Sequence, residues 1–216
     1  MLERAAEVET IYADEYLLVL NKPSGLLAVP GRGEDKQDCL SVRAQRRYPD
    51  ALIVHRLDMA TSGLMLMARG RAMQTALGKQ FEARQIGKRY IAVLNGNLEV
   101  HADWQLIDQP IALDWPRRPL RIISAALGKP SQTRWRAISY DAKADTTRVE
   151  LEPITGRSHQ LRVHMRALGH PIVGDALYAP LAVQLKSARL LLHACQLQFV
   201  HPASGEAMLF DNAPEF

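Results

Sequence analysis

The sequence predicts an α+β fold in which a mainly antiparallel or mixed central sheet is flanked by helices. Two observations lead to this prediction: segments with strand-like apolar patterns outnumber those with helical periodicity, and pairs of them are separated by short polar turns, as in β-hairpins. The chain has 216 residues, of which 47% are hydrophobic and 23% charged, as in ordinary soluble globular proteins. This length is sufficient to bury a core as one domain or as two joined halves.

The first third of the chain predicts one strand and two helices. Residues 16–20 form an apolar run typical of a buried strand, which ends where Pro23 interrupts regular pairing. Residues 39–48 and 71–84 have helical periodicity. The second of these helices carries a stripe of apolar residues that we expect to face the core, namely Met73, Ala76, Leu77 and Phe81.

The remainder predicts strands and one further helix. Residues 90–94 form an apolar strand that ends at the turn signal Asn-Gly. Residues 132–140 and 146–152 alternate like two strands of a hairpin. Residues 158–168 fit a helix that Gly169 terminates, and residues 190–200 are expected to form the final strand.

The termini and apolar runs predict a cytoplasmic protein with a single domain. Residues 1–10 are charged and lack an apolar segment, so they are not a signal peptide, and we expect a flexible tail. We expect residues 11–216 to form a single domain. No apolar run approaches the roughly 20 residues that span a bilayer, and no membrane association is predicted.

No metal site is predicted from the cysteines and histidines. Cys39 and Cys195 are far apart in the sequence and outside any metal-ligand spacing, which favours buried, reduced thiols. His159 and His164 are five residues apart, a spacing that suits no helical metal pair. Together with His55 they are expected to be hydrogen-bonded structural residues.

The high proportion of arginine among the basic residues indicates a nucleic-acid ligand more strongly than the net charge does. The net charge is only +4, but twenty of the 27 basic residues are arginines. Arginine grips phosphate with a planar fork and stacks on bases, which lysine does not do. A compositional bias of the genome remains an alternative explanation for the arginines.

The most informative segment is His-Arg-Leu-Asp-Met-Ala-Thr-Ser-Gly at residues 55–63. If the chain enters it in an extended conformation, Arg56 and Asp58 lie on one face and His55 and Leu57 on the other. A carboxylate is thereby placed beside a guanidinium at a strand-to-loop junction, where catalytic groups often lie. The alternative is that Asp58 only accepts backbone hydrogen bonds in a turn.

Three motifs together resemble the RluA-type pseudouridine synthases. They are the segment at residues 55–63, Asn-Lys-Pro-Ser-Gly at residues 21–25, and Ile-Thr-Gly-Arg-Ser-His-Gln-Leu-Arg-Val-His at residues 154–164. The resemblance extends from Ile11 to the C-terminus, and it is strongest to short members that lack an appended RNA-binding domain. It implies the pseudouridine synthase catalytic fold, in which two halves of a central sheet flank an active-site cleft.

The resemblance implies an isomerase that converts uridine in RNA to pseudouridine. This reaction breaks the N1–C1′ bond, rotates the uracil and rejoins it through C5. It requires an ionised carboxylate, a platform for the ring and positive charge, but no metal, redox group or nucleotide cofactor. The family match places the catalytic aspartate at Asp58. Residue types leave open whether this group attacks C1′, adds to C6 or acts as a base toward C2′.

The resemblance assigns two more catalytic residues. Arg157 is the guanidinium partner that keeps Asp58 ionised despite desolvation, although the residues alone do not favour it over Arg162 or Arg166. Tyr90 matches the family's active-site aromatic, whose ring stacks on the extruded uracil. Leu161 matches the position that packs beneath this ring, on the substrate-binding side.

Other substrate-binding residues follow from their chemistry. Arg56 is expected to contact RNA or to fill the gap that the extruded base leaves. Lys22 is expected to position the loop near the site, and a solvated charge is an equally good interpretation. Arg117 and Arg118 follow Trp115 in a proline-stiffened loop, and interleaved basic and aromatic residues favour RNA contacts over an ordinary surface loop.

Two rival functions are weighed against the isomerase. A non-catalytic RNA-binding module with the same fold is favoured only if the carboxylate, the aromatic or the arginine is missing, and all three are present. A phosphotransferase is excluded because Leu57 separates the aspartate from His-Arg, unlike in kinase catalytic loops. The implied substrates are stem-loop uridines of 23S ribosomal RNA, tRNA or both, and the protein is expected to be a monomer.

Overall fold

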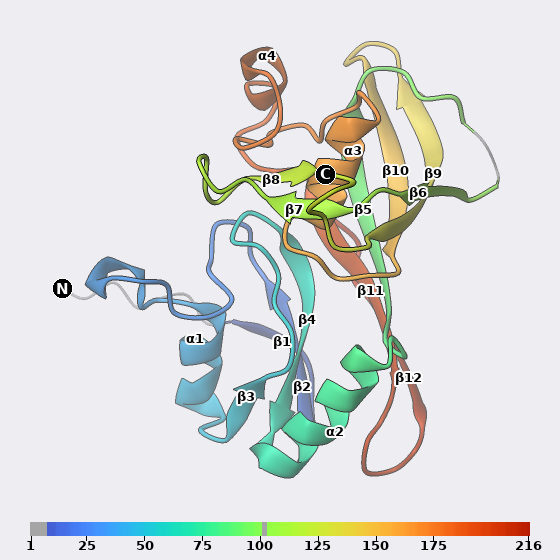
Figure 1. Ribbon diagram of the computed structural model, residues 1–216. Helices are drawn as coiled ribbons and strands as arrows, with labels where there is room; N and C mark the ends of the chain where they lie inside the picture. Colours follow the sequence, from blue (N-terminus) through green and yellow to red (C-terminus); the bar gives the residue numbers. More distant parts are fainter. Residues whose placement is uncertain (1–7, 101–102) are drawn as a thin grey trace. The chain divides into compact units, whose positions relative to one another are not determined.

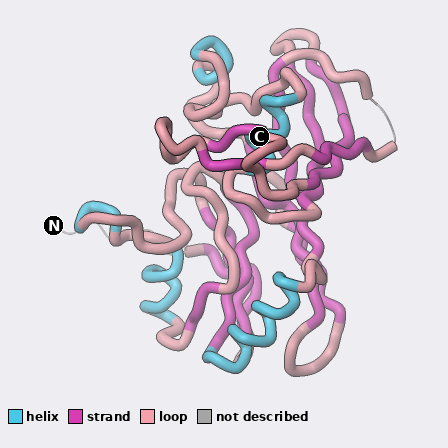
Figure 2. Tube along the Cα trace, in the orientation of Figure 1, coloured by secondary structure: helices cyan, strands magenta, loops and turns pink. Residues whose placement is uncertain are grey.

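The computed structural model describes residues 8–100 and 103–216, and the chain divides into two compact units (Figure 1). The first unit extends to Gly87 and resumes at Ala194–Pro214, and the second comprises Lys88–His193 with Glu215–Phe216. Two of the three crossings of the chain fall at strands, β5 (Gly87–Asn95) and β11 (Leu192–Val200), and the third lies between Pro214 and Glu215 near the C-terminus. Strands predominate over helices in each unit (Figure 2), which confirms the predicted α+β class.

The first unit is built on a sheet with strand order β1-β2-β4-β11, in which β3 pairs with β4 and β12 with β11. Leu77 and Leu66 belong to its buried core, against which Met73 and Phe81 pack. The apolar stripe predicted for the amphipathic helix therefore faces the core. In chain order the elements of this unit are β1 (Glu9–Ala13), β2 (Leu17–Lys22), η1 (Glu34–Lys36), α1 (Leu40–Arg47), β3 (Ala51–Ile53), β4 (Ser62–Arg69), α2 (Gly70–Glu82), most of β11, and β12 (Ala207–Asp211).

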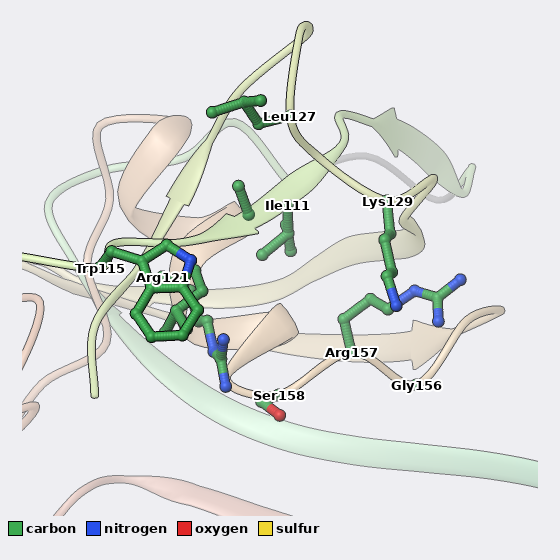
Figure 3. A pocket seen from close by; sticks show the side chains of 10 residues that line it. Ile111, Trp115, Arg121, Leu127, Lys129, Gly156, Arg157 and Ser158 are labelled. Carbon is green, nitrogen blue, oxygen red and sulfur yellow. The ribbon is translucent and has the colours of Figure 1, made fainter. Parts of the chain in front are cut away.

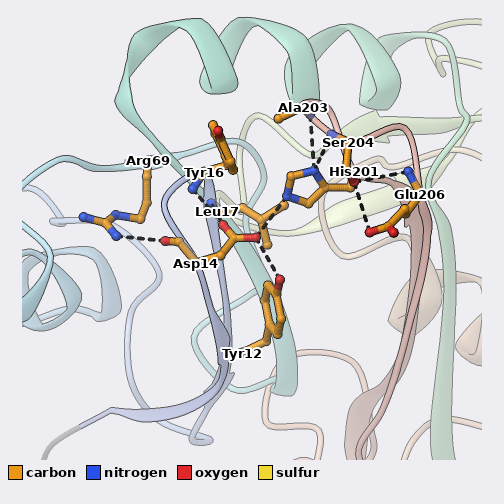
Figure 4. Close-up of polar contacts among 9 residues, drawn as sticks. All are labelled: Tyr12, Asp14, Tyr16, Leu17, Arg69, His201, Ala203, Ser204 and Glu206. Carbon is orange, nitrogen blue, oxygen red and sulfur yellow. Dashed lines mark hydrogen bonds and ion pairs between the residues drawn. The ribbon is translucent and has the colours of Figure 1, made fainter.

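Asp14 joins the loop between β1 and β2 to the turn between β11 and β12. Its carboxylate accepts hydrogen bonds from the backbone N–H groups of Tyr16 and Leu17, at 2.7 and 2.8 Å (Figure 4). It also accepts the Tyr12 hydroxyl at 2.8 Å and His201 Nε2 at 3.0 Å. Burial alone raises the pKa of Asp14, but the four hydrogen bonds outweigh it and the pKa is lowered.

The second unit contains a sheet with strand order β5-β10-β9-β6 and a separate two-stranded sheet, β7-β8. The strand pairs within these sheets are antiparallel, which confirms the hairpin predicted around residues 141–145. Besides β5, the elements are β6 (Gln105–Asp108), β7 (Ile111–Leu113), β8 (Arg121–Ile123), β9 (Gln132–Asp141), β10 (Thr146–Pro153), α3 (Gln160–Ala167) and α4 (Leu181–Gln184).

Two predictions about the ends of the chain need correction. Strand β1 begins at Glu9, so Glu9 and Thr10 do not belong to a flexible tail, whereas residues 1–7 of that tail lie outside the described residues. Strand β11 is not the final strand, because β12 follows and pairs with it. Met208 and Phe210 of β12 pack against the core of the first unit, which explains why this strand forms.

Candidate active site

Asp58 lies in an irregular segment between β3 and β4. Strand β3 ends at Ile53, so the approach to Asp58 is not a regular strand, although Leu57 is buried and Arg56 is exposed. The side chain of Asp58 is half-buried, and its backbone carbonyl accepts the N–H of Thr61 at 3.1 Å. The chain therefore turns back immediately after Asp58, which is the first residue of a closed turn with Met59 and Ala60 at its tip.

The segment at residues 21–25 holds this turn in place. The Ser24 hydroxyl donates to the backbone carbonyl of Ala60 at 2.7 Å, and the N–H of Gly25 donates to that of Met59 at 2.9 Å. Two of the motifs that carry the family resemblance are thus hydrogen-bonded to each other. Both residues directly after Asp58 are fixed by the neighbouring loop, which limits the motion of the carboxylate.

Lys22 also anchors this turn, and its side chain is fully buried. Its ammonium group donates to the backbone carbonyls of Pro23, Leu26 and Met59 at 2.9, 2.7 and 3.0 Å. An ammonium has three N–H donors, so these carbonyls match its capacity. The interpretation of Lys22 as a solvated charge is wrong, because its exposed fraction is 0%. The geometry favours the alternative in which Lys22 positions the loop.

The turn ends at a position that only glycine fits. Gly63 has a φ of +111°, and a Cβ there would lie 2.3 Å from the backbone carbonyl oxygen of Ala194. This distance is far inside van der Waals contact, and the atom to be displaced belongs to the backbone. The start of β4 is therefore pressed closely against β11.

His55 shapes the entrance to the turn. Its Nε2 accepts the backbone N–H of Leu66 at 2.9 Å, and its ring stacks on Phe81 with centroids 4.7 Å apart. His55 is therefore a hydrogen-bonded structural residue, as predicted.

Tyr90 in β5 lies on the face of the second unit's sheet that α3 covers. Thr133 marks that face, because its hydroxyl accepts a hydrogen bond from Gln160 of α3 at 3.0 Å. Trp135 is two residues further along β9 and lies opposite Leu151, which in turn lies opposite Tyr90. Directly opposed residues share a face, so Tyr90 is directed toward α3. It is 9% exposed.

Arg157 lies in the turn that precedes α3. Its backbone N–H donates to Oε1 of Gln160 at 3.0 Å, and the same oxygen accepts the Thr155 hydroxyl at 2.7 Å. Its side chain is exposed, and Nε donates to the backbone carbonyl of Pro130 at 3.3 Å. The turn is thus fixed from within by Gln160, while the guanidinium stays accessible. Leu161, the next residue of α3, is buried.

The loop between β7 and β8 holds the basic and aromatic residues that the sequence indicated. Asp114 is buried at its base and accepts the side chain of Arg117, with Nε at 2.7 Å and Nη2 at 2.6 Å. The guanidinium of Arg118 lies over the ring of Trp115, 4.7 Å from its centroid. The loop is non-helical, as predicted, and it is anchored at its base while its tip is exposed.

Comparison with known proteins identifies the family. The family model described as RNA pseudouridylate synthase matches residues 16–167. The chain belongs to this family. The dual-specificity RNA pseudouridine synthase RluA of Escherichia coli (strain K12) is 48% identical to this synthase, over 95% of this chain and 93% of the relative. RluA of Vibrio vulnificus is 49% identical over 91% of this chain and 79% of the relative.

Solved structures agree with the sequence relatives. Human RNA Pseudouridylate Synthase Domain Containing 1 has a TM-score of 0.81 at 29% identity, covering 97% of this chain and 84% of that one. Human RNA Pseudouridylate Synthase Domain Containing 4 has a TM-score of 0.73 at 26% identity, covering 96% and 89%. The resemblance found in the motifs is therefore confirmed over nearly the whole synthase, and the chain is an RNA-modifying isomerase.

The site residues expected in this synthase fall in both units. Asp58, Arg56 and Lys22 belong to the first unit. The second unit contributes the remaining expected residues, which are Tyr90, Arg117, Arg118, Arg157 and Leu161.

Within the described part of the chain, no helix combines the length and apolar character needed to cross a bilayer.

The structure of the synthase separates three arginines that the residues alone did not rank. Arg162 is 4% exposed and forms a two-pronged ion pair with Asp175, at 2.8 and 2.6 Å. Arg166 is exposed near the end of α3, whereas Arg157 is exposed before its start. The guanidinium of Arg162 is thus committed to the interior. Sequence reasoning missed this pair because Asp175 lies outside the motif, in an irregular segment after the helix.

The two histidines of the third motif are structural in the synthase. His159 Nδ1 lies 2.6 Å from the Tyr178 hydroxyl. His164 Nε2 lies 3.0 Å from the backbone carbonyl of Gln109, so this nitrogen carries a proton, and Nδ1 lies 2.8 Å from the Thr133 hydroxyl. Burial lowers the pKa of His164. His159 and His164 are therefore hydrogen-bonded structural residues, as predicted.

Proposed function

We propose that this synthase isomerises stem-loop uridines of ribosomal RNA, tRNA or both, with Asp58 as its essential carboxylate. The observation that supports this most strongly is that hydrogen bonds from a neighbouring loop anchor the turn that carries Asp58. Lys22, Ser24 and Gly25 bind the backbone carbonyls of the two residues that follow it. Catalysis demands that a reacting group be held to within about 0.5 Å, and three hydrogen bonds from a neighbouring loop supply such support.

The carboxylate serves a reaction in which the N1–C1′ bond of uridine breaks and a C5–C1′ bond forms. The hydrogen on C5 leaves as a proton, and N1 gains one, so no oxidant or reductant takes part. Attack at C1′, addition to C6 and proton abstraction at C2′ each require Asp58 to be ionised. The chemistry needs no metal, redox group or nucleotide cofactor.

Arg157 is proposed to keep Asp58 ionised in the complex with RNA, since a nearby guanidinium favours the charged form of a carboxyl group. The accessible guanidinium supports this role, and so does the commitment of Arg162 to Asp175. Tyr90 is proposed to stack on the uracil, with Leu161 setting the orientation of its ring. Their support is the shared location of Tyr90 and α3 on one side of the sheet.

RNA contact is assigned to exposed arginines of both units. Arg56 is exposed two residues before Asp58, and we propose that it contacts the RNA or fills the gap left by the flipped base. Arg118 and Trp115 present a cation and a ring at the tip of their loop. Arg117 is 69% exposed although it pairs with Asp114, and we propose that it also contacts RNA.

The substrate class follows from the relatives. RluA is named a dual-specificity RNA pseudouridine synthase, which supports action on two classes of RNA. We propose a small stem-loop that is recognised through its shape and its splayed bases. We further propose that the synthase is a cytoplasmic monomer.

The decisive experiment is tritium release from RNA labelled at uracil C5, using ribosomal RNA and tRNA that lack the modification. C5 must lose its hydrogen when it bonds to C1′, so release reports the isomerisation directly. We expect the wild type to release tritium from one or both RNAs. The Asp58→Asn variant should bind the same RNA and fold normally but release none.

Asp35→Asn is the matched control, because it removes one exposed carboxylate from the same unit. It should release tritium at the wild-type rate. Full activity of Asp58→Asn would contradict the role of the carboxylate. RNA binding without release by the wild type would instead favour a non-catalytic RNA-binding module.

A further inference from the structure

A pocket of about 610 Å³ lies within the second unit, beside the turn that carries Arg157 (Figure 3). Three segments form its walls: the β7-β8 hairpin, the segment after β8 and the turn before α3. Its lining includes Trp115, Arg121, Leu127, Lys129 and Arg157.

The pocket is already formed in the structure. Lys129 exchanges two backbone hydrogen bonds with Ile111, at 3.0 and 2.9 Å, which fixes the segment after β8 against the hairpin. A Cβ at Gly128 would lie 2.4 Å from the carbonyl oxygen of Ser124, so the turn there is tight. The Arg157 side chain is attached to the same segment through the carbonyl of Pro130. The walls therefore support one another.

The lining of this pocket is cationic. Arg121, Lys129 and Arg157 line it, and its lining contains no Asp or Glu. Among the described residues none of the three forms an ion pair. Like charges gathered in one cavity repel one another unless an anion joins them. The electrostatics therefore indicate an anionic ligand.

Arg121 lines the pocket, and one of its nitrogens has no partner among the described residues. Its Nε is buried and has no hydrogen-bond acceptor among the described residues. A buried N–H donor without an acceptor is rare in folded proteins, because it forfeits the hydrogen bond that water would have provided. A phosphate oxygen is the kind of acceptor that guanidinium groups bind best.

Apolar surface stands next to these cations. Trp115 is 65% exposed and Leu127 is 81% exposed, although both side chains belong to the pocket lining. Both side chains are therefore accessible to a ligand in the pocket. An aromatic ring beside a cluster of cations is the arrangement that binds a nucleobase together with its phosphate.

We propose that this pocket holds one nucleotide of the RNA substrate other than the target uridine. Arg121 and Lys129 bind its phosphate, and its base lies against Trp115 and Leu127. The proposal rests on the proposed function, since the ligand is part of the same RNA. Because Arg157 serves both the pocket and the reaction, the bound nucleotide is a near neighbour of the target in the folded RNA.

The test measures RNA affinity and turnover for Lys129→Gln and Arg121→Gln. Each variant should raise the Kd and KM for the RNA that supports tritium release about tenfold and leave kcat unchanged, because a phosphate contact binds ground state and transition state alike. Each should also reduce the slope of log Kd against log salt by about one. Trp115→Ala should weaken binding about tenfold without changing that slope.

Lys143→Gln is the matched control, because Lys143 is exposed in the same unit but lies outside the pocket. It should retain the wild-type affinity. Lys129 is exposed, so its variant remains informative if Arg121→Gln fails to fold. Wild-type affinity and salt slope in Lys129→Gln and Trp115→Ala would overturn the proposal.

Two further outcomes separate this proposal from its alternatives. If uridine 5′-monophosphate binds the wild type and not Lys129→Gln, while the Kd for RNA is unchanged, the pocket takes a free nucleotide and the proposal is wrong. If the wild type binds RNA but releases no tritium, the proposed function fails. The affinity measurements still decide whether the pocket contacts RNA in that case, because binding requires no turnover.

Discussion

Lys22 shows how a single buried charge can organise a catalytic turn. A charge removed from water is costly unless polar groups replace its hydration. Here three backbone carbonyls take that place, and one of them belongs to Met59, the residue directly after Asp58. The hydrogen bond from the Lys22 ammonium to the carbonyl of Met59 thus links the turn to β2. The same hydrogen bond fixes the position of the Asp58 carboxylate.

We expect Lys22→Met to lower the free energy of unfolding by about 3 kcal/mol, because it leaves buried carbonyls without a donor. At temperatures well below its melting point, the variant should lose about 10- to 100-fold in kcat, because a small displacement of a reacting group is sufficient for such a loss. KM for RNA should stay unchanged. Thermal denaturation and tritium release measure the two effects.

Lys36→Met is the control for Lys22→Met, because it removes an exposed lysine from the same unit. It should change neither stability nor kcat. A folded Lys22→Met variant with wild-type kcat would show that the lysine supports the fold and not the position of Asp58.

Burial of Lys22 could not be predicted from the sequence, since a lysine before a proline is compatible with solvent or with a loop contact. Its acceptors include the carbonyl of Met59, 37 residues further along the chain, and only the closed fold brings the two together. The choice of Arg157 over Arg162 came from resemblance for a related reason. The partner that buries Arg162, Asp175, lies outside every motif.

At the level of elements, the strength of the apolar pattern decides what the sequence can predict. Strand β2 and helix α2 were predicted because a continuous apolar run and a helical stripe mark them clearly. Strands β7 and β8 have three residues each, too few to show a period. In β12 only alternate residues, Met208 and Phe210, pack against the core, and no strongly apolar run marks it.

The contact between the β1-β2 loop and the β11-β12 turn predicts a pH dependence. The pKa of Asp14 is lowered in the folded protein from its ordinary value of 3.8. The folded state then binds fewer protons than the unfolded state below that value. The stability that Asp14 contributes is therefore complete above pH 3.8 and is lost as pH falls through the lowered pKa.

Asp14→Asn removes this contribution at every pH, so its melting temperature should lie below that of the wild type near neutral pH. The difference should be constant above about pH 4 and shrink as pH falls below about 3.8, because only the wild type loses stability through Asp14. Asp35→Asn serves as the control for removal of one carboxylate. A difference between wild type and Asp14→Asn that stays constant as pH falls below about 3.8 would contradict the assignment.

At the scale of the whole molecule, the proposed catalytic residues are divided between the two units. Asp58 belongs to the first, and Tyr90 and Arg157 belong to the second. The sequence predicted a single domain for residues 11–216. The chain passes between the units within strands β5 and β11, and once more between Pro214 and Glu215 near the C-terminus, so regular structure forms two of the three connections. Fraying of a strand at such a crossing disturbs both units, which favours cooperative unfolding.

A single domain predicts one thermal transition that variants in either unit shift together. Lys22→Met in the first unit and Arg162→Met in the second each remove a buried cation from its hydrogen-bond partners. Breaking the buried ion pair of Arg162 costs about 3–5 kcal/mol, and the carbonyls that Lys22 leaves without a donor are also costly, so both variants should lower the transition by several degrees. Calorimetry should give one peak in each, with the calorimetric enthalpy equal to the van't Hoff enthalpy. A second peak in one variant, with the other unit melting at the wild-type temperature, would mean that the two units fold as separate domains.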